Sequence, residues 1–221
     1  MVFQHNFLPR FNLNRIDSLE GRKYITPEGN SYESVTTFLG KQGKEAIDEW
    51  RKNIGEEEAN KISKKASSRG TNIHNGIEQF LLNEKVETPK NDFVFKSIFK
   101  HFTKVLEENI TNIQALEYPV YSDIMKLAGT LDLVADFNKV PSIVDFKTST
   151  KKKDKYEIEN YFLQVSIYSY MVEELYKIKI PNIVILIGVE FDPNIQIFIE
   201  NRNNFKTKLI NLLKVRNEKD E

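Results

Sequence analysis

The segment of residues 129–149, GTLDLVADFNKVPSIVDFKTS, constrains the fold of this chain more than any other. Its first half alternates and is rich in Leu, Val and Phe up to Phe137. Residues 138–141 interrupt this pattern, and a second apolar run begins at Ser142. Two such runs around a short turn predict a β-hairpin.

The predicted hairpin gathers charged side chains on neighbouring strands. Asp145 and Lys147 are two residues apart and therefore share a face of their strand. Asp132 falls opposite Asp145 if Phe137 pairs with Val140, and opposite Lys147 if the register shifts by two residues. Both registers bring together two carboxylates and an ammonium group, which suits a divalent metal ion with a lysine beside it. The alternative is a solvated ion pair, but Asp145 lies in an apolar strand, where unpaired charge is costly.

Composition excludes several kinds of site. The 221 residues include no cysteine, which excludes disulfides, thiolate-bound zinc, iron–sulfur clusters and a cysteine nucleophile. The 32 basic and 32 acidic residues balance, so attraction to nucleic acid would come from local patches. No apolar run reaches membrane-spanning length, and residues 1–15 lack the apolar stretch of a secretory signal. We therefore expect a cytoplasmic protein with no membrane partner.

Periodicity predicts a single α/β (α+β) domain, 1–221, in three parts. Residues 1–33 carry turn signals and are expected to be irregular, with a short strand near 23–26. Residues 34–110 are expected to form a helical elaboration, and residues 111–221 a core of five strands and two helices. The expected helices are 34–39, 43–53, 55–83, 91–109, 156–178 and 202–216. The expected strands of the core are 114–122, 126–137, 142–148, 183–191 and 194–199.

Polar side chains outside the hairpin could complete the site. His74 and Glu78 share a helical face; His74 is either a structural residue or a ligand, and Glu78 either a surface acid or a neighbour of the site. Glu117 is either a half-buried strand acid or close to the metal, directly or through water. Gln164 stands among apolar residues of a helix, where a buried amide needs a partner. Tyr168, four residues later, is first interpreted as packing.

A run of lysines follows the second strand of the hairpin. Lys151, Lys152 and Lys153 would ordinarily form a solvated loop. At the mouth of a metal site, they could instead bind a nucleic-acid backbone.

Together these residues resemble the PD-(D/E)XK nuclease superfamily, in its RecB-like branch, which includes mitochondrial, phage and bacterial exonucleases. The residues that carry the resemblance are Asp132, Asp145 and Lys147 of the central motif, His74 upstream, and Gln164 and Tyr168 of a Q-x-x-x-Y motif. The resemblance extends over residues 34–36, the helix around Trp50, residues 69–74 and residues 116–188. Residues 1–30 match no part of it.

The resemblance implies a restriction-endonuclease-like core, in which a mixed central sheet is flanked by helices, with a helical N-terminal elaboration. The implied metal ligands are His74, Asp132, Asp145 and the Phe146 carbonyl, with Glu117 and Glu78 as further candidates near the metal. The implied catalytic residues are Asp132, Asp145, Lys147 and Gln164, and the implied DNA-binding residues are Arg69, Lys151, Lys152, Lys153 and Tyr168.

The activity implied by the resemblance is that of a Mg²⁺- or Mn²⁺-dependent DNA exonuclease. It would prefer single-stranded DNA with free ends and act in phage or bacterial recombination, repair or DNA degradation. Replication or recombination proteins would be further partners. Some members of the branch hold a cysteine-bound iron–sulfur cluster, which this cysteine-free chain cannot form. The alternatives are a structure-specific or restriction-like endonuclease, and a nucleic-acid-binding module without catalytic activity.

Overall fold

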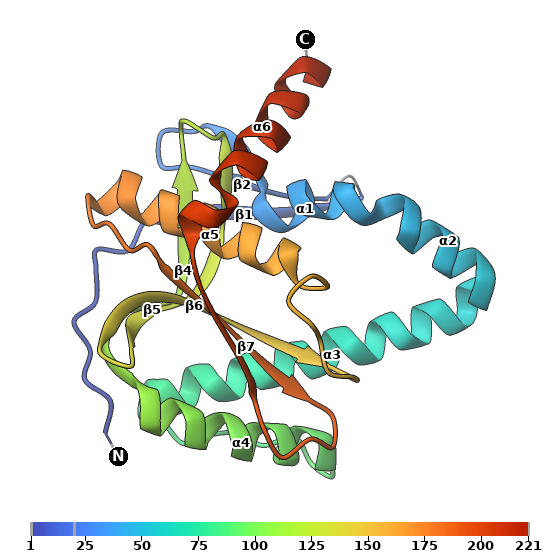
Figure 1. The fold of residues 1–221 in the computed structure, drawn as a ribbon, viewed down its shortest axis with the longest axis vertical. Coiled ribbons are helices and arrows are strands. Elements are labelled where there is room, and N and C mark those ends of the chain that lie inside the picture. The colour runs from blue at the N-terminus through green and yellow to red at the C-terminus, as the bar shows by residue number, and fades with distance from the viewer. Residues whose placement is uncertain (1, 20, 221) are drawn as a thin grey trace.

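One mixed β-sheet with helices on both faces organises the chain (Figure 1). The structure, a computed structural model, describes residues 2–19 and 21–220. The strands are β1 (Asn14–Ser18), β2 (Gly21–Ile25), β3 (Ser31–Ser34), β4 (Ile110–Ser122), β5 (Leu127–Phe137), β6 (Val140–Ser149), β7 (Asn182–Val189) and β8 (Gln196–Asn201). They are ordered β1-β2-β3-β5-β6-β7-β8, and β4 pairs with β5. The predicted mixed central sheet flanked by helices is confirmed.

The helices lie within a few residues of their predicted bounds. They are α1 (Val35–Gly40), α2 (Lys44–Ile54), α3 (Glu56–Leu81), α4 (Phe93–Asn109), α5 (Glu159–Tyr176) and α6 (Lys206–Asp220), with 3₁₀ turns at Lys41–Gly43 and Arg202–Phe205. Helix α5 covers one face of the sheet, and α3 with α4 covers the other (Figure 1). In the part of the chain that the structure describes, no helix combines the length and the apolar character needed to cross a bilayer.

The central hairpin adopts the first of the two predicted registers. Strands β5 and β6 are antiparallel, and Phe137 pairs with Val140. The two turn residues, Asn138 and Lys139, both have positive φ, at 51° and 64°. Two successive residues with positive φ form the tight turn whose twist matches that of the flanking strands.

The position of β5 in the sheet creates the break at which the site forms. Strand β4 pairs along one edge of β5 over its whole length, 127–137. A strand has only two edges, so β3 and β6 must share the other. There β3 pairs with residues 127–128 and β6 with residues 133–137. Residues 129–132 of β5, including Asp132, therefore lie at a break between two neighbouring strands.

The N-terminal segment corrects one prediction. The turn signals of residues 1–33 predict an irregular segment with one short strand, whereas β1, β2 and β3 form an antiparallel extension of the sheet. Every residue of β1 is exposed. The strand therefore shows no alternation of apolar and polar residues, which is the sequence pattern that predicts a half-buried strand. The extension is instead anchored by Tyr24 and Tyr32, which are buried with Tyr121 of β4.

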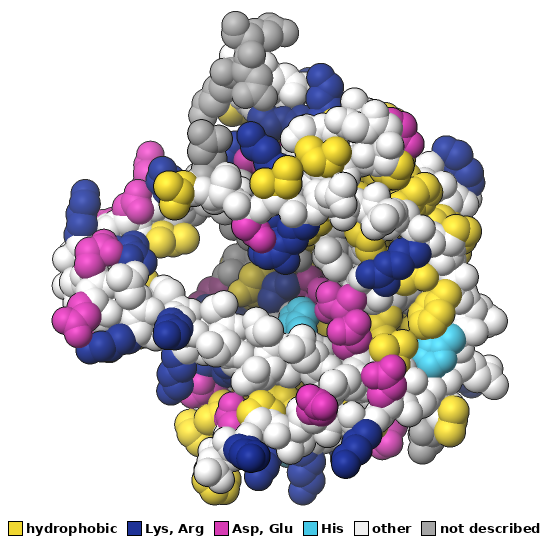
Figure 2. All heavy atoms as spheres, turned by 180° about the vertical axis from the view of Figure 1, so that it is seen from behind, with side chains coloured by type: hydrophobic (Ala, Val, Ile, Leu, Met, Phe, Trp, Pro, Cys, Tyr) yellow, Lys and Arg dark blue, Asp and Glu magenta, His cyan; other side chains and the backbone are white. Residues whose placement is uncertain are grey.

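Helices α2 and α3 form a limb that projects from the sheet (Figure 1). None of the residues of α2 is buried. The two helices meet at Gly55, whose φ of 86° and ψ of 146° suit glycine. Figure 2 shows an opening through the molecule between this limb and the body, with acidic and histidine side chains beside it. The limb and the body thus enclose a passage next to the sheet.

The packing of α4 on the sheet can be tested at Gly188 of β7. A Cβ atom there would lie 2.7 Å from Cε2 of Phe102 and would also meet Ile98. Gly188→Ala should therefore lower the free energy of unfolding by about 1–3 kcal/mol through overpacking. Chemical denaturation measures this change.

Gly70→Ala in α3 is the matched control, because a Cβ atom at Gly70 would have no neighbour within 4 Å among the described residues. This variant should gain about 0.5–1 kcal/mol, because alanine favours a helix over glycine. Equal effects of the two substitutions would contradict the close approach of α4 to β7.

Candidate active site

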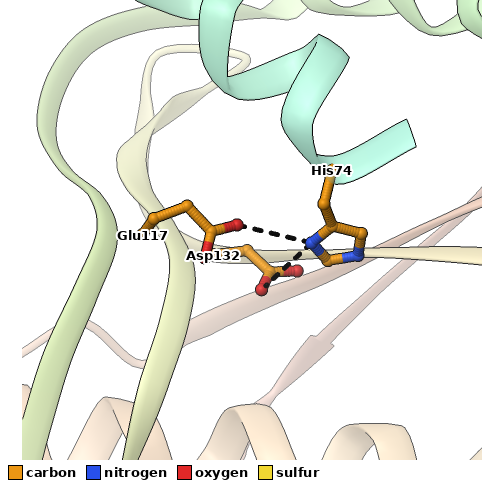
Figure 3. A group of neighbouring side chains, drawn as sticks. All are labelled: His74, Glu117 and Asp132. Carbon is orange, nitrogen blue, oxygen red and sulfur yellow. Dashed lines mark hydrogen bonds and ion pairs between the residues drawn. The ribbon is translucent and has the colours of Figure 1, made fainter. Parts of the chain in front are cut away.

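Three side chains from three elements converge at the break in the sheet (Figure 3). His74 comes from α3, Glu117 from β4 and Asp132 from β5, and one ligand atom of each lies within 4.8 Å of the others. His74 Nδ1 is 3.4 Å from Glu117 Oε1 and 3.7 Å from Asp132 Oδ1. We call this group the His74–Glu117–Asp132 cluster.

Asp132 is held where β5 and β6 separate. Counting from the hairpin turn, Leu133 is the last residue of β5 that pairs with β6, and its partner is Val144. The Asp132 carboxylate then accepts a 2.8 Å hydrogen bond from the Phe146 backbone N–H. Burial raises the pKa of this carboxyl group, against the attraction of His74 and Lys147. One Asp132 oxygen thus connects the two strands, and the other faces His74.

Glu117 reaches the cluster through an unusual backbone conformation. Its φ is 49°, in the left-handed region, although it lies within β4. On either side the β4–β5 ladder is intact, with Leu116 opposite Leu133 and Tyr118 opposite Leu131. Glu117 therefore lies across the ladder from Asp132, and the two carboxylates approach each other. A non-glycine residue with this φ carries about 1–3 kcal/mol of local strain.

His74 links the cluster to β6. Its Nε2 donates a hydrogen bond of 2.9 Å to the Phe146 carbonyl, and its Nδ1 faces the two carboxylates. Burial opposes a positive charge on the ring, but Asp132 and the hydrogen bond to Glu117 outweigh this and raise the pKa of His74 to about 9. A divalent cation among these carboxylates would displace that proton, because a metal binds the neutral imidazole.

Asp145, Lys147 and Gln164 form a second group beside the cluster. The Lys147 ammonium makes an ion pair with Asp145, and Gln164 Nε2 of α5 donates to Asp145 Oδ1 over 3.1 Å. Asp145 is 1% exposed, and burial raises its pKa to about 6 against the opposing effect of Lys147. Lys147 Nζ also lies 5.2 Å above the ring centre of Tyr161. Gln164 and Tyr161 therefore fix the orientation of the buried ion pair.

A cavity of about 290 Å³ connects the two groups. Its lining residues in the core are His74, Glu117, Gly129, Thr130, Asp132, Lys147, Gln164 and Tyr168. Those from the N-terminal part are Arg15, Arg22, Tyr24, Ser34 and Thr36. The cavity thus opens on the segment 129–132, where β5 has no neighbour between β3 and β6.

The structure brings most of the predicted site residues together, but it places some of them in other contacts. Arg69 pairs with Glu190 and donates to Thr148 Oγ1 over 3.1 Å. Glu78 is outside the three-residue cluster, and its pKa is raised by burial and by the charge of Glu117. Their proposed roles remain predictions.

Tyr168 and the lysines also have partners within the chain. Tyr168 is 2% exposed, and its hydroxyl lies so close to Gly129 that a Cβ there would be 2.7 Å away. Lys151 and Lys153 pair with Glu157, and Lys152 pairs with Asp192. DNA contact by the lysines would therefore compete with these surface ion pairs.

Seven residues that line the cavity were not predicted as site residues: Arg15, Arg22, Tyr24, Ser34, Thr36, Gly129 and Thr130. Thr130 could have been found, because it lies two residues before Asp132 in the same strand and such residues share a face. Ser34 and Thr36 belong to the start of α1, where the Ser34 hydroxyl accepts from the Thr37 backbone N–H as an N-cap. No sequence pattern could have identified Arg15 and Arg22, because they reach the cavity only through the pairing of β1 with β2.

The donor set of the cluster fits a small divalent cation. Two carboxylates supply hard oxygen ligands, and one imidazole supplies a nitrogen. The Phe146 carbonyl, the fourth ligand implied by the resemblance, accepts the hydrogen bond of His74 Nε2 over 2.9 Å. Mg²⁺ and Mn²⁺ accept such ligands, whereas a thiol-based site is excluded by composition. Asp132 is buried and Glu117 is half-buried, so their like charges repel each other with little solvent around them, and a divalent cation between them would relieve this repulsion.

Comparison with known proteins finds a family match over the part of the chain that contains the β5–β6 hairpin. The family model of the PD-(D/E)XK nuclease superfamily matches residues 85–194, which include β4, the β5–β6 hairpin and α5. Mitochondrial genome maintenance exonuclease 1 of Homo sapiens is 24% identical over 161 residues, covering 67% of this chain and 47% of that protein. The Mus musculus protein is 27% identical over 165 residues, covering 69% and 48%. The alignments therefore span about half the length of these curated relatives.

A solved structure named "Putative exonuclease", from Eubacterium rectale, superposes with a TM-score of 0.47 and 13% identity. The superposition covers 68% of this chain and 65% of that chain.

Cation binding at the cluster can be measured by thermal melting. Mg²⁺ or Mn²⁺ at about 100 times its dissociation constant should stabilise the protein by about 2.7 kcal/mol. For a chain of this size, that raises the melting temperature by roughly 5–10 °C. Asp132→Asn should abolish this increase, because it removes a charged ligand and keeps the side-chain shape. Glu107→Gln, an exposed position on α4, is the control and should keep it. An equal increase in Asp132→Asn would place the cation elsewhere.

Proposed function

Because the chain belongs to the PD-(D/E)XK nuclease superfamily, we propose that it is a metal-dependent exodeoxyribonuclease that degrades single-stranded DNA from free ends. The family match and the similarity to an exonuclease bear out the resemblance inferred from Asp132, Asp145 and Lys147. The observation that supports the proposal best is the His74–Glu117–Asp132 cluster in one cavity with the Asp145–Lys147 pair.

The cation and the buried ammonium would share the chemistry. A divalent cation at the cluster would stabilise the negative charge of the scissile phosphate and activate an attacking water. Lys147 keeps its proton, because Asp145 and Asp132 raise its pKa although burial opposes this. We therefore assign Lys147 to stabilising charge at the phosphate or to orienting the attacking water. Gln164 would hold Asp145 so that Lys147 stays directed into the cavity.

The preference for single strands rests on the limb formed by α2 and α3. The opening between limb and body lies beside the acidic side chains (Figure 2). A flexible strand could pass through such an opening by its end, whereas a duplex is stiff and has a much larger cross-section. Arg69, Tyr168 and the lysines 151–153 are the expected contacts to the strand, the lysines after leaving their ion pairs with Glu157 and Asp192. We expect the enzyme to act in phage or bacterial DNA metabolism, in the cytoplasm.

Substitution of the buried ion pair tests the chemistry. Asp145→Asn and Lys147→Gln should each lower the cleavage rate of linear single-stranded DNA by at least about a hundredfold, as loss of a charge that stabilises the transition state does. Lys139→Gln, in the exposed turn of the same hairpin, should cleave at the wild-type rate. Thermal melting confirms that each variant is folded at the assay temperature. Turnover by Lys147→Gln at the wild-type rate would contradict the role assigned to the ammonium.

The requirement for an end is tested with one sequence in two topologies. Linear single-stranded DNA should be degraded to short oligonucleotides in Mn²⁺ or Mg²⁺, and the closed circle of the same sequence should survive. Blunt duplex should be degraded slowly, and EDTA should stop all cleavage. Gel analysis of end-labelled and uniformly labelled substrates measures these rates.

The same assay separates the alternatives. Efficient cutting of closed circles would favour a structure-specific or restriction-like endonuclease on this fold. Binding without cleavage in either metal would favour a nucleic-acid-binding module.

A further inference from the structure

The hairpin of β1 and β2 presents two arginines and an aspartate on one face. In its register, Arg15 is opposite Tyr24, and Asp17 is opposite Arg22. Residues opposite each other in an antiparallel pair point to the same side, as do residues two apart in one strand. Arg15, Asp17, Arg22 and Tyr24 therefore share one surface of the hairpin.

Asp17 holds the two guanidinium groups together. It accepts hydrogen bonds from Arg15 Nε over 2.8 Å and from Arg22 Nε over 3.0 Å, and Arg15 Nη2 adds a third at 3.2 Å. The hydrogen bonds from Arg15 and then Arg22 lower the pKa of Asp17, so its carboxylate stays ionised. The group keeps one net positive charge. Each guanidinium has five N–H donors, so donors remain beyond those that Asp17 accepts.

This surface faces the catalytic cavity and is fixed to the sheet. Arg15 and Arg22 line the same cavity as Asp132 and Lys147. Tyr24 is 3% exposed, and its hydroxyl is 3.3 Å from Thr130 Oγ1, two residues from Asp132. The Arg22 backbone N–H donates to Thr37 Oγ1 of α1 over 3.1 Å, which ties the hairpin to the body at this point.

The arginine pair and the Lys147 ammonium lie on opposite sides of the break in β5. The hairpin joins the sheet through β3, which pairs with residues 127–128, whereas Lys147 is on β6, which pairs with residues 133–137. The acidic cluster lies between them. A nucleic-acid strand approaching the cluster therefore meets carboxylates that repel its phosphates, with the net positive arginine pair on one side and the ion-paired Lys147 ammonium on the other.

We propose that Arg15 and Arg22 form a phosphate-binding subsite that positions the DNA strand next to the phosphate being cut. The inference rests on the proposed nuclease function and names a substrate contact of that same cavity. Two planar guanidinium groups held by one carboxylate can each donate two hydrogen bonds to the oxygens of a phosphate. Two independent lysines would offer only point charges without this fixed geometry. The phosphate is either the terminal phosphomonoester of a strand or an internal phosphodiester.

Binding without cleavage tests this subsite. Fluorescence anisotropy in EDTA is recorded with short thymidine oligonucleotides that carry a 5′-phosphate, a 3′-phosphate or neither, over a range of salt concentrations. Arg15→Gln/Arg22→Gln should weaken binding about tenfold or more, the effect of losing a hydrogen bond to a charged group. The slope of log K against log salt should fall by about 0.7 for each phosphate that the variant no longer neutralises.

Two variants serve as comparisons. Lys100→Gln/Lys104→Gln removes the same charge from the exposed side of α4 and should leave affinity and slope unchanged. Arg15→Lys/Arg22→Lys keeps the charge and should restore most of the slope. Thermal melting of all variants verifies the fold.

The three oligonucleotides identify the source of the phosphate. A gain in wild-type affinity from one terminal phosphate, abolished in Arg15→Gln/Arg22→Gln, assigns the subsite to the strand end. An equal reduction in affinity for all three assigns it to an internal phosphodiester. Unchanged affinity and slope in that variant would overturn the subsite, as would a wild-type protein that binds none of the oligonucleotides. Cleavage assays on the same wild-type preparation show separately whether the proposed nuclease function holds.

Discussion

The insertion of the Asp132 carboxylate between β5 and β6 is the constraint on which the rest of the site depends. The carboxylate takes the hydrogen bond of the Phe146 N–H, so the β5–β6 ladder stops at Leu133 and Val144. Because β3 rejoins the same edge of β5 only at residues 127–128, a segment of four residues is left open in the middle of the sheet. An uninterrupted ladder would fill this space with backbone, and the cavity could not form.

The central part of this arrangement could be predicted from sequence, because it depends on local patterns. The alternation of apolar residues and the break at 138–141 identified the hairpin, and period-two spacing placed Asp145 and Lys147 on one face. The isolated amide of Gln164 correctly indicated a buried partner, which is Asp145. The resemblance implied that Asp145 joins His74 and Asp132 at the metal, with Glu117 as a further candidate. In the structure Glu117 lies with His74 and Asp132, while Asp145 contacts Lys147 and Gln164, so the ligand set remains a prediction.

The parts that escaped prediction depend on contacts between distant segments. Strand β1 is polar and exposed, so its presence follows from backbone pairing and not from hydrophobic pattern. Arg15 and Arg22 enter the cavity only because β3 places the hairpin beside β5. The surroundings of Arg69 were equally hidden, since its partner Glu190 is far away in sequence. Such pairings are decided by the packing of the whole sheet, which a single sequence does not encode locally.

The backbone conformation of Glu117 lowers stability at a position that the proposed activity needs. Its left-handed conformation, with φ of 49°, suits glycine far better than glutamate, and the carboxylate it delivers adds negative charge to a site already occupied by Asp132. A glycine at this position would relieve both costs and leave the cluster without one of the three side chains proposed to hold the cation. Selection for thermostability alone would thus tend to erase the site. Selection for metal-dependent function would instead favour a glutamate at this position.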